Sequence, residues 1–252
     1  MGIQSNDVKL EKSGIMNRSF KIHHFLITDL KLIFRDKSLI IFLFIPFVVL
    51  AFLKYAIPAI VRFYPAFTNY YTLVLGLLAL VMSVFPGFIM AFIIIDEREQ
   101  NILDVFRVLP VSFSKLIYRR TFLTALLSFA YSFVILEFSD LVILERLPNL
   151  AVSILNSFLG PISALLIVSF ASNKIEGMTY MKGINFIWII PVAYFFIDSP
   201  LKYVFAIIPD YWTLQIIYGN ANPSNAFLIG FVFHLLVLII TAKIFIQKMA
   251  QS

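Results

Sequence analysis

The chain has 252 residues, of which 61% are hydrophobic and 13% are charged, with a formal net charge of +6 and no cysteine. Soluble domains carry about 25% charged residues, so this composition indicates an integral membrane protein without a separate soluble domain. The lack of cysteine excludes disulfides, thiolate metal sites and cysteine nucleophiles. The basic residues lie between apolar runs rather than in one stripe, which favours a role in membrane orientation over nucleic-acid binding.

The chain begins with a mixed polar stretch, residues 1–15, which we interpret as a tail that is either disordered or not native. This stretch lacks the apolar core of a signal peptide, so we expect no cleavage. Residues 16–252 are predicted to form a single all-α transmembrane domain. Its first element, residues 18–37, has apolar residues at helical spacing with basic residues around them, which predicts an amphipathic helix at the cytoplasmic membrane surface.

Six apolar runs are predicted to cross the membrane, since about 20 apolar residues span a hydrocarbon core of about 30 Å. The fifth run is short and contains Pro191. A kink is expected at Pro86-Gly87, and Gly160-Pro161 is predicted to break the fourth run. The six predicted spans are residues 38–58, 72–95, 121–138, 147–172, 183–197 and 226–242.

The distribution of basic residues predicts the orientation of these spans. Six spans place both termini on one side of the membrane. Of the 20 lysines and arginines, those that then fall on the opposite side are Lys54, Arg62, Arg146 and Lys202. Because cytoplasmic loops are enriched in basic residues, both termini are predicted to be cytoplasmic.

A charged stretch, DEREQNILDVFRVLPVS, separates the second and third spans. Its apolar residues Ile102, Val105, Phe106 and Leu109 form one stripe on a helix, and Pro110 ends that helix. The stretch is therefore predicted to be a short amphipathic helix on the cytoplasmic side. A helix of this kind is also typical of a simple connector that lies on the bilayer surface.

The stretch from Asp198 to Pro223 is apolar and aromatic, but Pro200, Pro209 and Asp210 interrupt it. It is too short and too broken to cross the membrane twice. Because irregular backbone inside a membrane is tolerated only against protein or water, we predict a re-entrant or interfacial hairpin on the outer side.

No catalytic motif is present: HExxH, GxSxG and the Walker A sequence are all absent from the chain. His234 is the one histidine within a predicted span, and a hydrogen-bonded contact between helices is a commoner role for it than catalysis. Glu137 and Asp140 lie near a predicted membrane boundary. They are candidates for a proton or cation site, although boundary carboxylates more often face water.

The run IIIDEREQNILDVFRVLPVSFSKLIYRR resembles the cytoplasmic segment of ABC-2 type permeases, which are membrane subunits of bacterial exporters. In that family an acidic-Arg-acidic group ends a span, and a short amphipathic helix, Pro-x-Ser and a basic start of the next span follow. The chain has Asn101-Ile102 where the family often has Gly-Thr. The sequences IIIDERE and RVLP look closest to the small drug-export permeases of the family, including those named for fluoroquinolone export.

The resemblance extends over nearly the whole chain and implies a set of site residues. It implies an ATPase-coupling helix comprising Glu97, Arg98, Glu99, Ile102, Asp104, Phe106, Leu109 and Pro110. It also implies an N-terminal interface helix that contains Phe25, Leu30, Arg35 and Asp36, and an outer re-entrant segment that contains Pro209, Tyr211 and Trp212.

The same resemblance implies the function of a permease subunit in the bacterial cytoplasmic membrane that exports a hydrophobic or amphipathic drug, lipid or peptide. It implies two partners, a separate ATP-binding subunit that carries ATP and Mg and a second permease subunit, with no cofactor on this chain. The alternative is a channel or a transporter driven by an ion gradient. That alternative requires ionisable groups deep in the spans, and the sequence has almost none beyond His234.

Overall fold

The computed structural model describes residues 31, 34, 37–102, 113–219 and 221–251. Every regular element in these ranges is a helix. The chain divides into two units, residues 1–41 and 42–252. In the first unit the described residues are 31, 34 and the start of helix α2 (Lys37–Ala51), and the arrangement described below is that of the second unit.

Five helical stretches in the described ranges are long and apolar enough to cross a membrane: Leu39–Phe63, Pro65–Glu99, Leu116–Phe138, Arg146–Phe170 and Pro223–Met249. The first combines α2, a π-helical turn (Phe52–Ala56) and α3 (Ile57–Phe63), and the second combines the 3-10 helix η2 (Pro65–Tyr70) with α4 (Tyr71–Glu99). The others are α6 (Phe113–Phe138), the pair α7 (Arg146–Asn156) and α8 (Leu159–Phe170), and α11 (Pro223–Gln251). The prediction of an all-α, multi-pass membrane protein is confirmed.

The predicted fifth span, residues 183–197, is not one of these five stretches. It coincides with the second half of α9 (Lys174–Ile189) and with the 3-10 helix η3 (Ile190–Phe196), which follows directly. Pro191 has no backbone N–H, so the α-helical hydrogen-bond ladder is interrupted where η3 begins. The number of six spans therefore stays a prediction.

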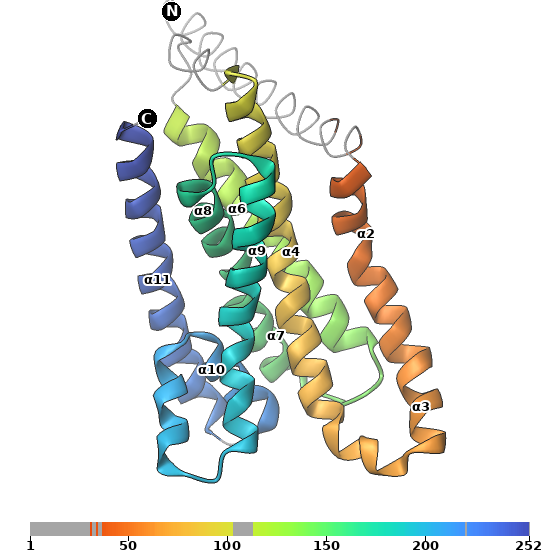
Figure 1. The fold of residues 1–252 in the computed structure, drawn as a ribbon. Helices are drawn as coiled ribbons and strands as arrows, with labels where there is room; N and C mark the ends of the chain where they lie inside the picture. Colours follow the sequence, from red (N-terminus) through yellow and green to blue (C-terminus); the bar gives the residue numbers. More distant parts are fainter. Residues whose placement is uncertain (1–30, 32–33, 35–36, 103–112, 220, 252) are drawn as a thin grey trace, which may run out of the picture. The chain divides into compact units, whose positions relative to one another are not determined.

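The broken stretch after η3 forms two short helices, the 3-10 helix η4 (Pro200–Ile207) and α10 (Asp210–Tyr218). No residue of η4 is buried, whereas most of α10 is buried against α4, α7 and α11. Gly219, at φ +66°, ends α10 in the left-handed conformation that favours glycine. Within the second unit these helices lie at the end of the bundle opposite the C-terminal end of α4 (Figure 1). Their placement as a re-entrant segment in a membrane stays a prediction.

Helix α4 is the central helix of the bundle. In the most apolar 18 residues of the candidate span Pro65–Glu99, which contains α4, 83% of the residues are buried. The corresponding part of Pro223–Met249, in α11, has 22% buried residues. Helix α4 packs most extensively on α6 and α8, and it also contacts α9 and α10. Helices α6, α8, α9 and α10 therefore pack directly on α4, whereas α7 and α11 pack on these helices.

Two glycines permit the closest approach of α4 to α8. A Cβ atom on Gly87 would overlap the carbonyl oxygen of Gly160, and a Cβ atom on Gly160 would overlap the Ser128 hydroxyl of α6. The dipeptide predicted as a kink, Pro86-Gly87, and the one predicted as a break, Gly160-Pro161, thus lie against each other. Helix α4 continues through Pro86, whereas the break between α7 and α8 lies at residues 157–158, shortly before Pro161. Pro161 is tolerated there because it falls in the first turn of α8.

Buried polar side chains follow one face of α6 at steps of four residues: Arg120, Thr124, Ser128 and Ser132. The Thr124 hydroxyl lies 3.1 Å from the Met90 sulfur of α4, and the Asn156 amide of α7 donates to Ser132 at 2.9 Å. Residues four apart share a helix face, so this polar row fixes which face of α6 meets α4 and α7.

We predict that Gly87→Ala lowers the free energy of unfolding of the purified chain in detergent by about 1–3 kcal/mol, because an added Cβ overpacks backbone against backbone. The matched control is Gly183→Ala in α9, where a Cβ meets nothing within 4 Å. This control should leave stability unchanged or raise it by up to about 1 kcal/mol through helix propensity. Equal stability of the two variants in denaturant titration contradicts the close approach.

Candidate functional site

Four successive charged residues, Asp96, Glu97, Arg98 and Glu99, end helix α4. We call them the Asp96–Glu99 cluster. Successive residues of an α-helix are rotated by about 100°, so four in a row point to all sides of the helix. Each of the four side chains accordingly contacts a different group on the neighbouring helices.

Glu97 forms a two-point ion pair with Arg120 of α6. The two guanidinium nitrogens lie 2.6 and 2.7 Å from the two carboxylate oxygens, and both residues are 6% exposed. A bidentate arginine–carboxylate pair is directional as well as charge-neutral. It therefore fixes the distance and the rotation of α4 relative to the start of α6.

Arg98 binds the end of α8. Its guanidinium donates to the carbonyls of Val168 and Ala171, at 2.9 Å each. The last carbonyls of a helix lack partners within the helix, and a cation there also interacts favourably with the helix dipole. The same guanidinium lies 3.5 Å from the sulfur of Met249 near the end of α11. Arg98 thus joins α4 to α8 and α11.

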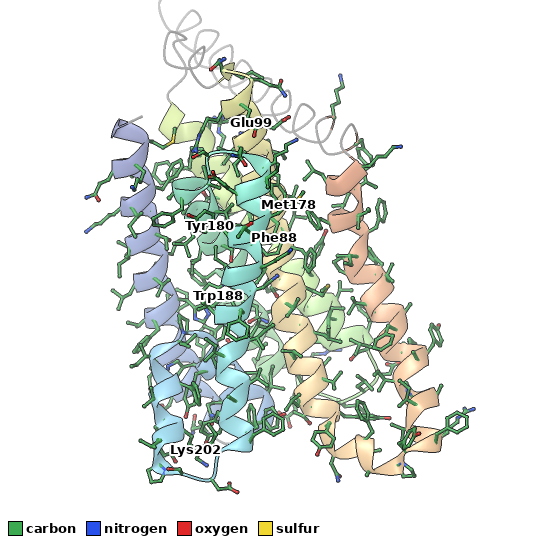
Figure 2. The ribbon with its side chains drawn as sticks, viewed as in Figure 1. Phe88, Glu99, Met178, Tyr180, Trp188 and Lys202 are labelled. Atoms are coloured by element: carbon green, nitrogen blue, oxygen red, sulfur yellow. The ribbon has the colours of Figure 1, made fainter. Side chains whose placement is uncertain are left out.

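Asp96 and Glu99 hold the start of α9. Asp96 pairs with the Lys174 ammonium at 3.0 Å, and Glu99 accepts a hydrogen bond from the Lys174 backbone N–H at 3.1 Å (Figure 2). The first N–H groups of a helix need external acceptors and favour negative charge. The helix begins at an Asn173 cap whose side chain accepts from the N–H of Glu176 at 2.9 Å. The Asp96–Glu99 cluster therefore connects the end of α4 to four helices, α6, α8, α9 and α11.

The chain turns sharply after the cluster. Gln100 ends α4, and Asn101 has a φ of +56°, in the left-handed region. Asparagine is one of the few residues with a side chain that adopts this conformation readily. The resemblance to ABC-2 type permeases implies Gly-Thr at Asn101-Ile102, and asparagine adopts the same left-handed conformation that a glycine here would.

Most residues of the predicted coupling helix lie outside the described residues. Ile102 is the last described residue before residue 103, and it is half-buried. Asp104, Phe106, Leu109 and Pro110 lie outside the described residues, as do the interface-helix residues Phe25, Leu30, Arg35 and Asp36. Their roles stay predictions, whereas Glu97, Arg98 and Glu99 have the contacts given above.

The predicted outer residues lie around the start of α10. Pro209 precedes its first residue, Tyr211 is buried, and the Trp212 indole donates to the Ala206 carbonyl of η4 at 3.1 Å. Tyr211 also packs edge-to-face on Tyr194 of η3, with 5.2 Å between ring centres. These contacts join α10 to the two 3-10 helices before it.

The carboxylates at the predicted outer boundary do not form a common site. Asp140 pairs with Lys54 at 2.7 Å, and Glu137 accepts from the Asn149 amide at 2.6 Å. No group of three or more potential metal-ligating side chains occurs in the part of the chain that the structure describes. The pairing of Asp140 with Lys54 instead joins the first and third candidate spans.

Sequence reasoning missed the partners of the cluster and one buried pair. Arg120 stands just before the third predicted span and Lys174 just after the fourth, and neither position indicates a partner. Asp210 was considered only as an interruption of an apolar stretch, although it lies beside His234 in the interior. An aspartate inside an apolar and aromatic segment was the available signal, because such a residue requires a partner.

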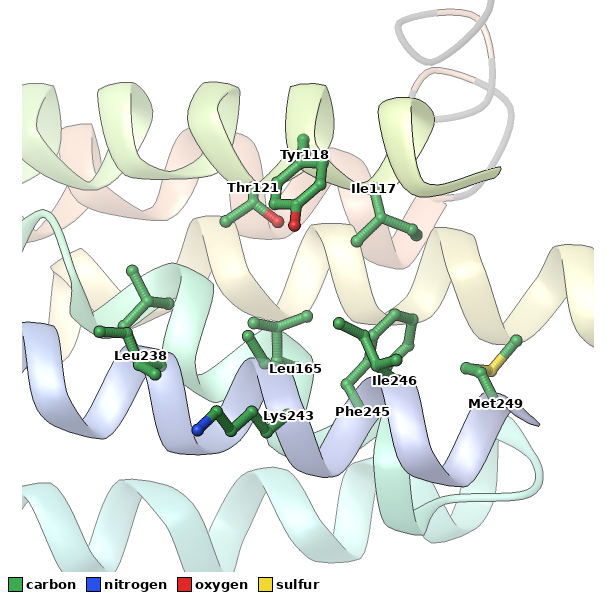
Figure 3. A pocket seen from close by; sticks show the side chains of 11 residues that line it. Ile117, Tyr118, Thr121, Leu165, Leu238, Lys243, Phe245, Ile246 and Met249 are labelled. Carbon is green, nitrogen blue, oxygen red and sulfur yellow. The ribbon is translucent and has the colours of Figure 1, made fainter. Parts of the chain in front are cut away.

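A cavity of about 540 Å³ lies between α6 and α11, with Leu165 of α8 also lining it (Figure 3). Its lining is mostly aliphatic, and its polar side chains are Tyr118, Thr121 and Lys243. Met249, which also contacts Arg98, lines the cavity on the side of the Asp96–Glu99 cluster. Pockets for drug-sized molecules measure about 300–1,000 Å³ and are lined mainly by apolar groups, so this cavity has a matching size and chemistry.

Comparison with known proteins identifies a related group. The family model described as "Fluoroquinolones export permease protein Rv2686c-like" matches residues 29–242. The proteins named fluoroquinolones export permease protein MT2760 and Rv2686c, from two strains of Mycobacterium tuberculosis (CDC 1551 / Oshkosh and ATCC 25618 / H37Rv), are each 27% identical over 154 residues. The matched region covers 58% of this chain and 60% of each relative's length. No solved structure matches the chain significantly.

We predict that Arg120→Met lowers the free energy of unfolding in detergent by about 3–5 kcal/mol, because it leaves the Glu97 carboxylate buried without its partner. The double variant Glu97→Gln/Arg120→Met should recover part of this loss. The matched control is Arg119→Met, which removes the same charge from an exposed neighbour and should change stability by no more than about 0.5 kcal/mol. Similar losses for Arg119→Met and Arg120→Met contradict the importance of the ion pair.

Proposed function

The chain belongs to the Rv2686c-like family of fluoroquinolone export permease proteins, and we propose that it is the membrane-spanning permease subunit of an ATP-driven ABC exporter. Its cargo is a hydrophobic or amphipathic molecule, namely a drug, a lipid or a peptide, that leaves the cell. The chain is a transport subunit and not an enzyme. Its location is the bacterial cytoplasmic membrane, with both termini in the cytoplasm.

ATP binding and hydrolysis belong to a separate partner subunit, which carries ATP and Mg. The chain itself has no Walker A sequence. A second permease subunit, identical or different, completes the export route, because one chain of six spans is too small to enclose it. The fifth of these six spans is formed by α9 together with η3, which follow one another without interruption from Lys174 to Phe196.

One observation carries this proposal: every side chain of the Asp96–Glu99 cluster binds a neighbouring helix of the bundle. A segment that transmits force from an ATPase must be joined firmly to the elements it moves. The predicted coupling helix follows the cluster after only a sharp turn at Asn101. A partner that displaces this helix therefore acts on α4, α6, α8, α9 and α11 together.

The cavity between α6 and α11 supports an apolar cargo. It is adjacent to the Asp96–Glu99 cluster through Met249, so movement of the cluster alters a drug-sized space. The decisive experiment is transport by the purified chain in vesicles, with and without the partner ATPase. Accumulation of a fluoroquinolone should require both the partner and ATP. Uptake by the chain alone, driven by an ion gradient, supports the alternative of a secondary transporter.

The alternative has one observation in its favour. Asp210 and His234 form a deeply buried ionisable pair, which is the kind of group that ion-driven transport requires. A single such pair also occurs without any role in driving transport. The nucleotide requirement in the vesicle experiment distinguishes the two functions.

We predict that Phe106→Asp abolishes co-purification of the ATPase and transport-stimulated hydrolysis, while expression and membrane insertion stay intact. A charge placed in a desolvated contact remains unpaired there and costs several kcal/mol. The matched control is Val108→Asp, which adds the same charge on the opposite face of the predicted helix. Full transport and retained association in Phe106→Asp mean that the segment is only a surface connector.

We predict that residues 96–118 are cytoplasmic and residues 199–224 are external. The chain has no cysteine, so single cysteines introduced near Gln100 or Asn220 are the only labelling sites. In intact cells a membrane-impermeant maleimide should label the cysteine near Asn220 and leave the one near Gln100 unlabelled. The reverse pattern contradicts the orientation derived from the basic residues.

A further inference from the structure

Asp210 and His234 form a buried pair that the export mechanism does not use. Their closest atoms, Asp210 Oδ1 and His234 Nε2, are 3.7 Å apart, and both residues are 0% exposed. Asp210 is the first residue of α10, and His234 lies on α11, against which α10 packs. The pair therefore joins a short helix at one end of the bundle to a candidate membrane span.

The pair lies far from both ends of that span. At 1.5 Å per residue, His234 is about 16 Å from Pro223 and about 22 Å from Met249 along α11. The ring of Phe158, at the break between α7 and α8, packs on the His234 ring with 5.8 Å between centres. The pair is thus enclosed by protein, and His234 lies well inside α11 rather than at either of its ends.

The hydrogen bonds of His234 determine how many protons the pair holds. Its Nδ1 lies 2.7 Å from the carbonyl oxygen of Gly230, and a carbonyl only accepts, so Nδ1 carries a hydrogen. Nε2 and both carboxylate oxygens of Asp210 have no other hydrogen-bond partner. Without a further proton, Nε2 and the carboxylate are both acceptors and cannot bond to each other, which leaves an uncompensated charge in an apolar site.

One additional proton removes this conflict. On Asp210 it makes an O–H donor to a neutral imidazole, and on His234 it makes an imidazolium beside a carboxylate. The pair has no net charge in either case, and the two groups become donor and acceptor. The separation of 3.7 Å exceeds hydrogen-bond length by only a few tenths of an ångström, so a small movement closes it.

The other titratable groups near α10 do not supply a second counter-charge. Among the described residues, no ion pair or hydrogen bond joins any of them to the Asp210 carboxylate. The tyrosines Tyr211 and Tyr194 pack on each other, and Lys202 of η4 lies over the Tyr194 ring. Apart from the pair itself, the titratable residues on α10, on α11 and on the elements that pack against them are Tyr71, Asp96, Glu97, Arg98, Glu99, Arg146, Tyr194, Lys202, Tyr203, Tyr211, Tyr218, Lys243 and Lys248.

We propose that Asp210 and His234 form an intramembrane proton-binding site, in which one proton held between them keeps helix α10 inserted in the bundle. Release of this proton leaves a buried carboxylate without a donor, and α10 then moves toward water at its end of the bundle. Two further buried polar atoms of α10, Thr213 Oγ1 and Gln215 Nε2, also lack hydrogen-bond partners. Few polar bonds therefore oppose this movement.

The direction of the pH effect follows from proton linkage. Burial raises the pKa of the Asp210 carboxyl, so the folded state keeps this proton to a higher pH than the unfolded chain does. Stability that depends on the pair is then present at neutral pH and is lost as the pH rises. The replacement of Asp210 by a neutral residue of the same shape should remove this dependence.

The test measures the exposure of α10 in the purified full chain in detergent, without ATPase or cargo, so its outcome is independent of the export function. Thr213→Cys introduces one thiol at a buried position whose hydroxyl has no partner, and Ser199→Cys provides a more accessible reference for the pH dependence of the thiol itself. The rate of maleimide labelling in Thr213→Cys, divided by the rate in Ser199→Cys, should be low at neutral pH. This ratio should rise at least tenfold as the pH is raised.

When Asp210→Asn is added to the Thr213→Cys variant, the labelling ratio should stay low at every pH. The asparagine amide donates to Nε2 of His234 and has no proton that is lost in this pH range. The matched control is Asp198→Asn, an exposed aspartate shortly before η4, which should leave the pH response intact. An unchanged pH response in Asp210→Asn overturns the proposal. Failure of Asp210→Asn to fold also overturns it, because a neutral side chain of equal size satisfies the site as proposed.

Discussion

The buried ion pair between Glu97 and Arg120 is the constraint on which the rest of the bundle depends. Two charges that are almost fully removed from water must satisfy each other, so α4 and α6 have one permitted rotation and one permitted register at this point. The row of polar residues that continues from Arg120 along α6 extends the same register toward α7. Next to this row, the contact between Gly87 and Gly160 brings α8 against α4. The polar bonds and the small residues therefore specify one packing of otherwise interchangeable apolar helices.

The ends of several helices meet where this ion pair lies. Arg98 binds the last carbonyls of α8, and Asp96 and Glu99 bind the first residue of α9. The unsatisfied backbone groups at two helix ends thus find charged partners on a third helix. A displacement of the end of α4 cannot occur without moving these helices or breaking several charged contacts. This mechanical connection supports the proposal that an ATPase acts on the segment that follows α4. Met249, which contacts Arg98, also lines the drug-sized cavity.

The sequence predicted the helical architecture well because apolar length and charge placement report directly on membrane crossing. It also located the Asp96–Glu99 cluster and the breaks at Pro209 and near Gly160. Pairings between distant residues were not predictable: nothing in the local pattern around Arg120 indicates that it meets Glu97, and nothing around His234 names Asp210. The fifth span is less clear from the sequence. Helix α9 carries three charged residues, Lys174, Glu176 and Lys182, and Pro191 follows the helix. The packing of α9 on α4 and α8 cannot be read from this pattern. Tertiary partners of polar residues depend on packing that a single sequence does not specify.

The role of the Asp96–Glu99 cluster in transmitting motion is tested most directly by the ratio of transport to ATP hydrolysis. This ratio is measured in the reconstituted complex of Arg98→Met with its ATPase. Arg98 does not belong to the predicted ATPase-binding stripe, so the partner should still bind and hydrolyse ATP. With the contact to Val168 and Ala171 lost, however, the end of α4 is no longer bound to the end of α8, so less of the movement of the coupling segment reaches α8. The account predicts that hydrolysis persists while transport per ATP falls at least tenfold relative to the unmodified complex. An unchanged ratio in Arg98→Met contradicts the claim that the Asp96–Glu99 cluster transmits the motion.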